Sequence, residues 1–195
     1  MTKKARLAIF ASGSGTNAEA IMNYFQKHSQ TQVVILLSNN PDALALERAK
    51  KFSVSCRVFN KEQFRASDEV LEWLKEYEVT HIVLAGFLWL IPEKLIKAFP
   101  NRIINIHPSL LPKFGGKGMY GMKVHEAVKA AGEAVTGITI HLVNEHFDEG
   151  KILVQVSCAI SAADSPQEIA AKVYALEYAN YPKAIEQWVS SKEQF

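Results

Sequence analysis

Two side chains suited to hydrogen-bond and proton chemistry, an amide and an imidazole, stand two residues apart at Asn105 and His107. The isoleucines around them predict a β-strand, and Pro108 ends it because proline has no backbone N–H to donate. Alternate side chains of a strand share a face, so we expect the pair to converge at the strand end, where open α/β sheets carry their sites. An amide beside an imidazole suits the stabilisation of an oxyanion in acyl transfer. The alternative is a hydrogen-bonded core histidine without chemistry.

A carboxylate would complete this pair, because it raises the pKa of an imidazole and fixes its orientation. Asp148, in the acidic turn 145–150, is the first candidate, and Glu145 and Glu149 have weaker claims. Spacing along the chain does not tell whether this turn folds back over the strand end, so a solvated turn aspartate stays open as the alternative. We find no nucleophile elbow with a triad, which favours direct transfer between two bound substrates over a covalent enzyme intermediate.

A second chemical feature is the glycine turn 12–17, Ser-Gly-Ser-Gly-Thr-Asn, between a predicted strand and a predicted helix. Backbone N–H groups and the positive end of a helix meet at such a turn, so it predicts a phosphate site. Gly13, Gly15 and Ala18 also satisfy the loose dinucleotide pattern. The second strand, however, runs into Ser38 and Asn39 and lacks the acidic residue that would hold ribose hydroxyls. A plain tight turn remains the alternative, as does a protein that binds NAD or another nucleotide.

The remaining histidines and the cysteines predict no metal site, because none has the spacing of a ligand set. We expect Cys56 and Cys158 to be reduced residues that pack beside strands. His28 and His125 are expected at the surface or at a helix end. His141 lies on a strand and could face either side.

Length and charge limit the classes of protein that are possible. With 195 residues the chain is expected to form one domain, residues 1–195, that buries roughly 70% of its unfolded surface. The 22 basic and 20 acidic residues are interspersed, which argues against nucleic acid or an anionic membrane as a partner. No apolar run approaches the roughly 20 residues of a membrane span, and the start of the chain lacks a signal-type segment. We therefore expect a cytoplasmic protein.

Short aliphatic runs alternate with amphipathic stretches, which is typical of βαβ units and predicts an α/β fold with a mostly parallel sheet. The predicted strands are Arg6–Ala11, Gln32–Ser38, Ser55–Phe59, His81–Ala85 and Arg102–His107. The predicted helices are Asn17–Lys27, Ala43–Lys51, Ser67–Tyr77, Glu93–Ala98 and Gly121–Ala131.

The last third of the chain follows another pattern. Val135–Asn144 and Lys151–Ile160 are extended runs that predict an antiparallel hairpin at the sheet edge. A final helix is expected from Ser165 to about Trp188, because Ser165-Pro166 supplies a cap and a first-turn proline. The glycine-rich segment 115–118 is the best candidate for a mobile loop.

Several segments together resemble the folate-dependent formyltransferase family. They are SGSGTN after the first strand, LAGFLWLIP, NIHPSLLP, GITIHLVNEHFDEG and ALEYANYP, and the resemblance extends from about residue 6 to about residue 188. It implies a Rossmann-like formyltransferase fold. It also implies transfer of a formyl group from 10-formyltetrahydrofolate to the amine of 5-phosphoribosylglycinamide in de novo purine biosynthesis, without a metal. Related hydrolases and tRNA formyltransferases are expected to carry an additional domain.

The resemblance also assigns roles to residues. It implies that Asn105, His107 and Asp148 are catalytic, and that the ribonucleotide lies on Gly15, Thr16, Asn17 and Glu177. The folate is implied to lie against Leu88, Trp89, Leu90, Ile91, Asn105, Asn144, Glu145, His146, Phe147 and Asp148, with Arg65 beside it. Taken alone, Leu88 to Ile91 would be core and Glu177 an ordinary helix carboxylate. Small-molecule substrates and a monomer or homodimer are the partners expected.

Overall fold

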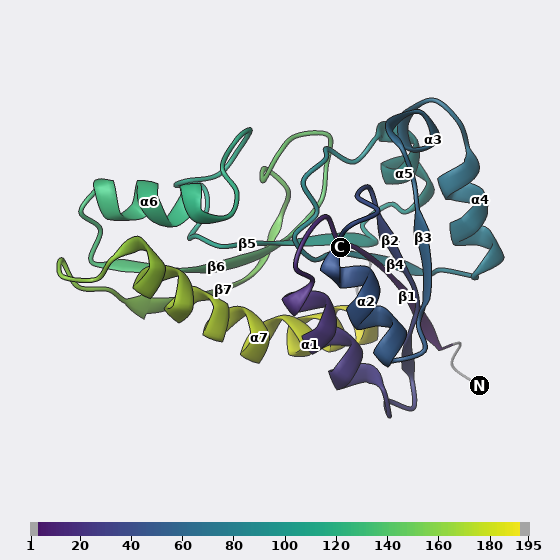
Figure 1. Ribbon diagram of the computed structural model, residues 1–195, viewed down its shortest axis with the longest axis horizontal. Helices are drawn as coiled ribbons and strands as arrows, with labels where there is room; N and C mark the ends of the chain where they lie inside the picture. The colour runs from purple at the N-terminus through teal and green to yellow at the C-terminus, as the bar shows by residue number, and fades with distance from the viewer. Residues whose placement is uncertain (1–3, 192–195) are drawn as a thin grey trace.

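A single seven-stranded sheet runs through the computed structural model, which describes residues 4–191 (Figure 1). Its strands lie in the order β3-β2-β1-β4-β5-β6-β7. They are β1 Ala5–Phe10, β2 Thr31–Ser38, β3 Ser55–Val58, β4 His81–Leu84, β5 Ile103–His107, β6 Val135–Leu142 and β7 Ile152–Ala159. The strands from β3 to β5 pair in parallel, whereas β6 and β7 join antiparallel. The predicted α/β class and the edge hairpin are thus confirmed. Met1, Thr2 and Lys3 lie outside the described residues.

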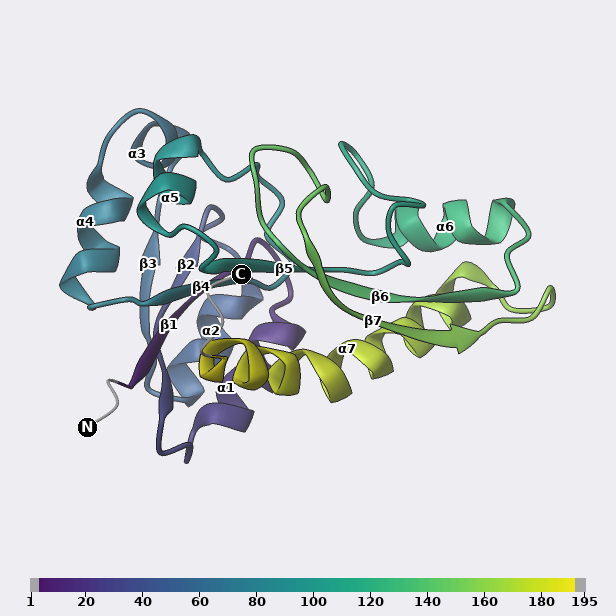
Figure 2. The ribbon, with the colours of Figure 1, turned by 180° about the vertical axis from the view of Figure 1, so that it is seen from behind.

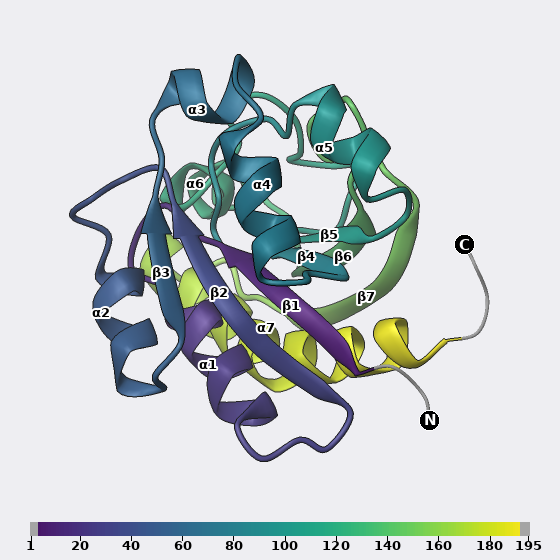
Figure 3. The same ribbon diagram turned by 90° about the vertical axis from the view of Figure 1, so that its right-hand side faces the viewer.

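The helices cover both faces of the sheet (Figures 1 and 3). They are α1 Thr16–Phe25, α2 Leu44–Lys51, α3 Lys61–Arg65, α4 Glu69–Glu76, α5 Glu93–Ala98, α6 Met122–Ala130 and α7 Pro166–Ser190. Leu7 and Ile9 of β1 belong to the core cluster shared with α1, α2 and α7, while Ala8 and Phe10 belong to the cluster shared with α3, α4 and α5. Both faces are therefore buried, which explains why the central strands are apolar throughout.

Two helix starts show how the sequence sets the boundaries. Ser165 and Glu168 form a capping box at the start of α7, and Pro166 fills its first turn, as predicted. Asn60 and Gln63 form the same kind of box at the start of α3, a short helix that we did not predict. The predicted helix Ser67–Tyr77 begins two residues later, at Glu69.

The long helix α7 ties the C-terminal part of the chain to the parallel strands. Tyr181 is fully buried in it, and its hydroxyl donates a hydrogen bond to the carbonyl of Leu84, 2.9 Å away at the end of β4. Figure 2 shows α7 running beside the hairpin strands β6 and β7 and ending near α1. Residues of α7 are thereby held against both halves of the sheet.

The strand order reverses between β1 and β4, which is the point where open α/β sheets bind ligands. The segments that follow β1, β4 and β5 leave the sheet on this edge. They are the glycine turn 12–15, the apolar segment 85–92 and the proline and glycine segment 108–121. In the described part of the chain, no helix is both long enough and apolar enough to cross a membrane.

Candidate active site

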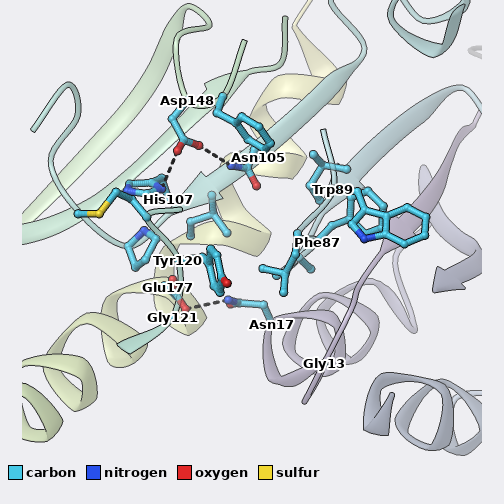
Figure 4. Close-up of a pocket in the computed structure, with 18 of the residues that line it drawn as sticks. Gly13, Asn17, Phe87, Trp89, Asn105, His107, Tyr120, Gly121, Asp148 and Glu177 are labelled. Carbon is cyan, nitrogen blue, oxygen red and sulfur yellow. Dashed lines mark hydrogen bonds and ion pairs between the residues drawn. The ribbon is translucent and has the colours of Figure 1, made fainter. Parts of the chain in front are cut away.

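A cleft of about 720 Å³ opens at this edge of the sheet (Figure 4). That volume suits a small-molecule site. Its lining combines the glycine turn 13–17, the segment 84–91, the strand end 105–108 and the loop 116–121 with parts of the hairpin turn and of α7. The two features on which the sequence argument rested, the phosphate turn and the amide–imidazole pair, thus line one cavity.

Asn105, His107 and Asp148 meet on one side of the cleft. The Nδ1 atom of His107 lies 3.3 Å from Oδ2 of Asp148, and the amide of Asn105 donates to Oδ1 across 3.4 Å. The backbone N–H of Gly116 donates to Oδ2 across 2.9 Å. The acidic turn therefore does fold back over the strand end, so the solvated-turn alternative for Asp148 is wrong.

The imidazole of His107 has a hydrogen-bond acceptor at each nitrogen. Opposite Asp148, its Nε2 lies 2.8 Å from the carbonyl oxygen of Phe114. Burial lowers the pKa of His107, while the Asp148 charge and the Phe114 carbonyl oppose that shift. Because a neutral ring carries only one N–H, both contacts are hydrogen bonds only when the ring is protonated.

Asp148 is held as a carboxylate. Burial acts to raise its pKa, but His141, His107 and the Gly116 N–H outweigh it and leave the pKa below its ordinary value. At neutral pH this side chain carries a negative charge beside His107. Its contacts therefore suit orienting the imidazole and stabilising its protonated form.

His141, whose facing was left open, belongs to the same cluster. Residue 141 is the partner of Asn105 in the antiparallel register of β5 and β6. Its Nδ1 lies 2.8 Å from the Leu142 carbonyl, and its Nε2 lies 3.2 Å from the Asn105 amide nitrogen and 3.6 Å from Oδ1 of Asp148. With Nδ1 donating to the carbonyl, Nε2 of the neutral ring accepts from Asn105. The signal missing from the sequence was the strand register.

The glycine turn at the other side of the cleft has the form of an anion site. Gly15 is the N-cap of α1, with φ of 71°, and no side chain caps the helix, so its first N–H groups are available to a ligand. A Cβ on Gly15 would lie 2.5 Å from Ala45 of α2, so the turn needs glycine for packing as well as for its backbone. The turn is supported by α2, since Arg48 donates to the carbonyl of Ser14 across 2.8 Å.

Glu177 of α7 closes the cleft beside this turn. It is only 5% exposed, and its Oε2 accepts a hydrogen bond from the Asn17 amide, 2.8 Å away. Burial raises the pKa of Glu177 to about 7, although the Asn17 hydrogen bond acts against the rise. No cation pairs with Glu177 among residues 4–191. The view of this residue as an ordinary helix carboxylate is therefore wrong.

The segment 88–91 lines the cleft, so its reading as plain core is wrong in part. Leu88 is 47% exposed there, and its N–H donates to the hydroxyl of Ser12, which holds the segment beside the phosphate turn. Ile91 is buried and Trp89 packs against Phe64, 5.7 Å between ring centroids. Leu88 is exposed and Ile91 is buried because the segment passes over the strand end, where only one side of the segment packs against the rest of the protein.

Other predicted residues divide between the cleft and its surroundings. His146 and Phe147 line the cleft, whereas Asn144, Glu145 and Arg65 are not among its lining residues, and Arg65 is exposed at the end of α3. A contact of these three with folate stays a prediction. No group of three His, Cys, Asp or Glu in the described ranges could hold a metal ion. Cys56 and Cys158 are free and partly buried.

The expectation that His28 and His125 lie at the surface or a helix end needs correction for His125. His28 follows α1 and pairs with Glu186 across 2.9 Å. His125 is fully buried, because its side of α6 packs against α7 together with Val124 and Val128. It also lines the cleft.

Comparison with known proteins agrees with this geometry. The family model described as "Formyl transferase" matches residues 5–185. Phosphoribosylglycinamide formyltransferase of Bacillus subtilis is 36% identical over 93% of this chain and 93% of its own length. The chloroplastic enzyme of that name from Arabidopsis thaliana is 41% identical over 94% of this chain. The chain spans only 65% and 61% of the length of the Arabidopsis and Vigna unguiculata relatives.

Solved structures show the same fold. The phosphoribosylglycinamide formyltransferase of Anaplasma phagocytophilum superposes with a TM-score of 0.89 at 30% identity, covering 97% of this chain and 89% of that one. The Bacillus halodurans enzyme of that name gives 0.84 at 37% identity, with coverage of 97% and 98%.

Proposed function

The chain belongs to the formyl transferase family, and from this premise we propose that it transfers a formyl group from 10-formyltetrahydrofolate to the amine of 5-phosphoribosylglycinamide, a step of de novo purine biosynthesis. The observation that carries the proposal is the union in one cleft of an anion-binding turn with the Asn105, His107 and Asp148 cluster. The phosphate of the ribonucleotide needs the anion-binding turn, and transfer of the formyl group needs the cluster of Asn105, His107 and Asp148.

The ribonucleotide is assigned to the side of the cleft formed by α1 and α7. Its phosphate is held by backbone N–H groups of Gly15, Thr16 and Asn17, in the way that helix N-termini bind anions. Glu177, hydrogen-bonded to Asn17, lies next to the remainder of this substrate. In this arrangement the amine of the substrate extends toward His107.

The folate is assigned to the side formed by the segment 88–91 and the hairpin turn. Exposed Leu88 and the cleft-lining Trp89, Leu90, Ile91, His146 and Phe147 offer the apolar and aromatic surface that suits a pterin. Asn105 and Asp148 stand at the inner end of this surface, where the formyl group would lie. No cofactor beyond this formyl donor and no metal enters the proposal.

The reaction follows from these positions. As the amine nitrogen bonds to the formyl carbon, the carbonyl oxygen becomes an oxyanion, which the Asn105 amide and the protonated His107 stabilise. Burial lowers the pKa of His107, and the Asp148 carboxylate acts against that shift, so it favours the protonated ring as the negative charge forms on the oxygen. The bond from the formyl carbon to the folate nitrogen then breaks, and that nitrogen gains the proton that the attacking amine loses. Because Nδ1 of His107 faces Asp148, Nε2 is the donor left for the oxyanion, once the Phe114 carbonyl yields its place.

The test is a direct assay of formyl transfer with both substrates, using the wild type, His107→Ala and Asp148→Asn. We expect each substitution to lower kcat at least about a hundredfold, since each removes a charged or donating group from the reacting centre. Asp42→Asn, a change at an exposed turn aspartate, is the matched control and is expected to have no effect. Unchanged turnover in both active-site variants would overturn the mechanism, and no turnover in the wild type would overturn the function.

An NAD-binding or nucleotide-binding protein is not favoured as an alternative. It would use Gly13 and Gly15 for the pyrophosphate, but β2 ends in Ser38, whose hydroxyl bonds to the backbone of Asn40, and offers no carboxylate for ribose hydroxyls. A cytoplasmic location and a monomer or homodimer complete the proposal as expectations. Light scattering of the purified protein tests the second of these.

A further inference from the structure

His125 is a buried imidazole that the proposed reaction does not use. It lies in α6 and its exposed fraction is 0%. Neither of its ring nitrogens has a hydrogen-bond partner among the described residues. Nearly all buried polar side-chain atoms in proteins find a partner, and one without a partner weakens the folded state. An imidazole with two such atoms therefore calls for an explanation.

Packing alone does not explain this residue. Its neighbours on α6, Val124 and Val128, are apolar, and an apolar side chain at position 125 would fill the space without leaving two nitrogens unpaired. Metal binding does not explain it either, since residues 4–191 contain no set of three candidate ligands. Burial, aided by the charge of His107, lowers the pKa of His125 to about 4, so at neutral pH the ring offers one donor and one acceptor.

The position of His125 indicates what would pair with it. The ring lines the cleft and lies edge-on to the Tyr174 ring, at 5.8 Å between centroids. Tyr174 stands three residues before Glu177 on α7, and Glu177 binds Asn17 of the phosphate turn. His107 lines the same cleft, and its charge acts to lower the pKa of His125. His125 thus lies between the phosphate turn and the reacting centre, where the middle of the ribonucleotide is assigned.

We propose that His125 is a substrate-binding residue, whose neutral imidazole forms a hydrogen bond with a ribose hydroxyl of the ribonucleotide. A hydroxyl both donates and accepts, so it matches either nitrogen of a neutral ring. The inference rests on the proposed function, because that function supplies the ribonucleotide. Contact requires the segment before α6 to shift, and that shift is part of the proposal; Gly118 and Gly121 of this segment have φ of 91° and 56° and open space where a Cβ would stand.

The proposal predicts opposite effects on stability and on binding, which a packing role would not produce. In His125→Phe, an aromatic ring remains beside Tyr174 but both nitrogens are gone. We expect the melting temperature of the unliganded protein to stay level or rise. The Kd for 5-phosphoribosylglycinamide, measured by titration calorimetry without folate, is expected to rise at least tenfold, while the Kd for a folate ligand changes less than twofold. His125→Leu, a smaller replacement, is expected to give the same weakening and serves if the phenylalanine variant does not fold.

A change on the same helix provides the control. Val128→Ala removes buried carbon from α6 at a residue that does not line the cleft, so it should lower the melting temperature and leave both Kd values unchanged. Ribonucleotide binding at the wild-type Kd in a folded His125 variant overturns the inference and leaves the proposed function intact. If the wild type itself does not bind the ribonucleotide, the proposed function and the inference both fall.

Discussion

Asn105 and His141 face each other across the antiparallel pair β5 and β6, with the amide nitrogen of Asn105 3.2 Å from Nε2 of His141. The same amide donates to Asp148, so its orientation is fixed from two sides. His141 reaches no reacting atom in the proposed mechanism. We propose that it acts through Asn105, as a positioning residue.

Replacement of His141 by leucine should therefore lower kcat without removing activity. Loss of one hydrogen bond of ordinary strength corresponds to about a tenfold decrease in rate. We expect His141→Leu to change kcat by about that factor and to leave the KM of the ribonucleotide nearly unchanged, because the phosphate turn is untouched. His141→Gln, which restores an acceptor, should recover part of the rate. Equal kcat in the leucine variant and the wild type would remove His141 from the site.

Glu177 makes a prediction about stability and pH. Burial raises the pKa of its folded-state carboxyl from 4.5 to about 7, so the folded protein favours the protonated form. The stabilising contribution is present below the unfolded pKa and is lost as the pH rises through about 7. Glu177→Gln, which removes the buried charge, should raise the free energy of unfolding by about 3 kcal/mol at pH 8.5 and by little at pH 5. Urea denaturation at the two pH values measures this, and Glu72→Gln, a change at an exposed residue of α4, should show no such difference. A gain that does not depend on pH would contradict the assignment.

Gly15 and Gly13 offer a matched pair in the phosphate turn. A Cβ on Gly15 would collide with Ala45, and its φ of 71° is unfavourable for other residues, whereas a Cβ on Gly13 meets nothing within 4 Å. Gly15→Ala should cost at least about 1 kcal/mol of stability and raise the KM of the ribonucleotide far more than that of the folate. Gly13→Ala should have a small effect on both. Steady-state kinetics, with each substrate varied in turn, measures the two KM values. Equal effects on both would contradict the assignment of the ribonucleotide and the folate to separate sides of the cleft.

Arg48 supports the same turn from behind. It donates to the Ser14 carbonyl and pairs with Glu19 of α1, and it does not line the cleft. Because the pair is partly exposed, we expect a modest effect: Arg48→Ala should raise the KM of the ribonucleotide about threefold and leave kcat unchanged. Lys50→Ala, an exposed change on the same helix, is the control. An unchanged KM would mean that the turn keeps its shape without this support.

The sequence predicts those parts of the fold and of the candidate site that depend on local patterns. The strands, the N-cap of α7 and the glycine turn each depend on a few neighbouring residues, and these were found where expected. His141 could not be assigned because its facing depends on the register of β6 against β5. The burial of Glu177 and His125 could not be predicted because it depends on how α6 and α7 pack. The prediction that Leu88 is a core residue was wrong, because in the sequence an apolar run just after a strand cannot be distinguished from one inside the sheet.

The hydrogen bond from Tyr181 to the Leu84 carbonyl has a consequence for the order in which the protein matures during synthesis. The residues that carry the phosphate turn and the amide–imidazole pair leave the ribosome long before α7 does. Until α7 docks, the end of β4 lacks this partner and Asn17 lacks Glu177. Because α7 is translated after these segments, the cleft gains its Glu177 side only when α7 docks on the parallel strands.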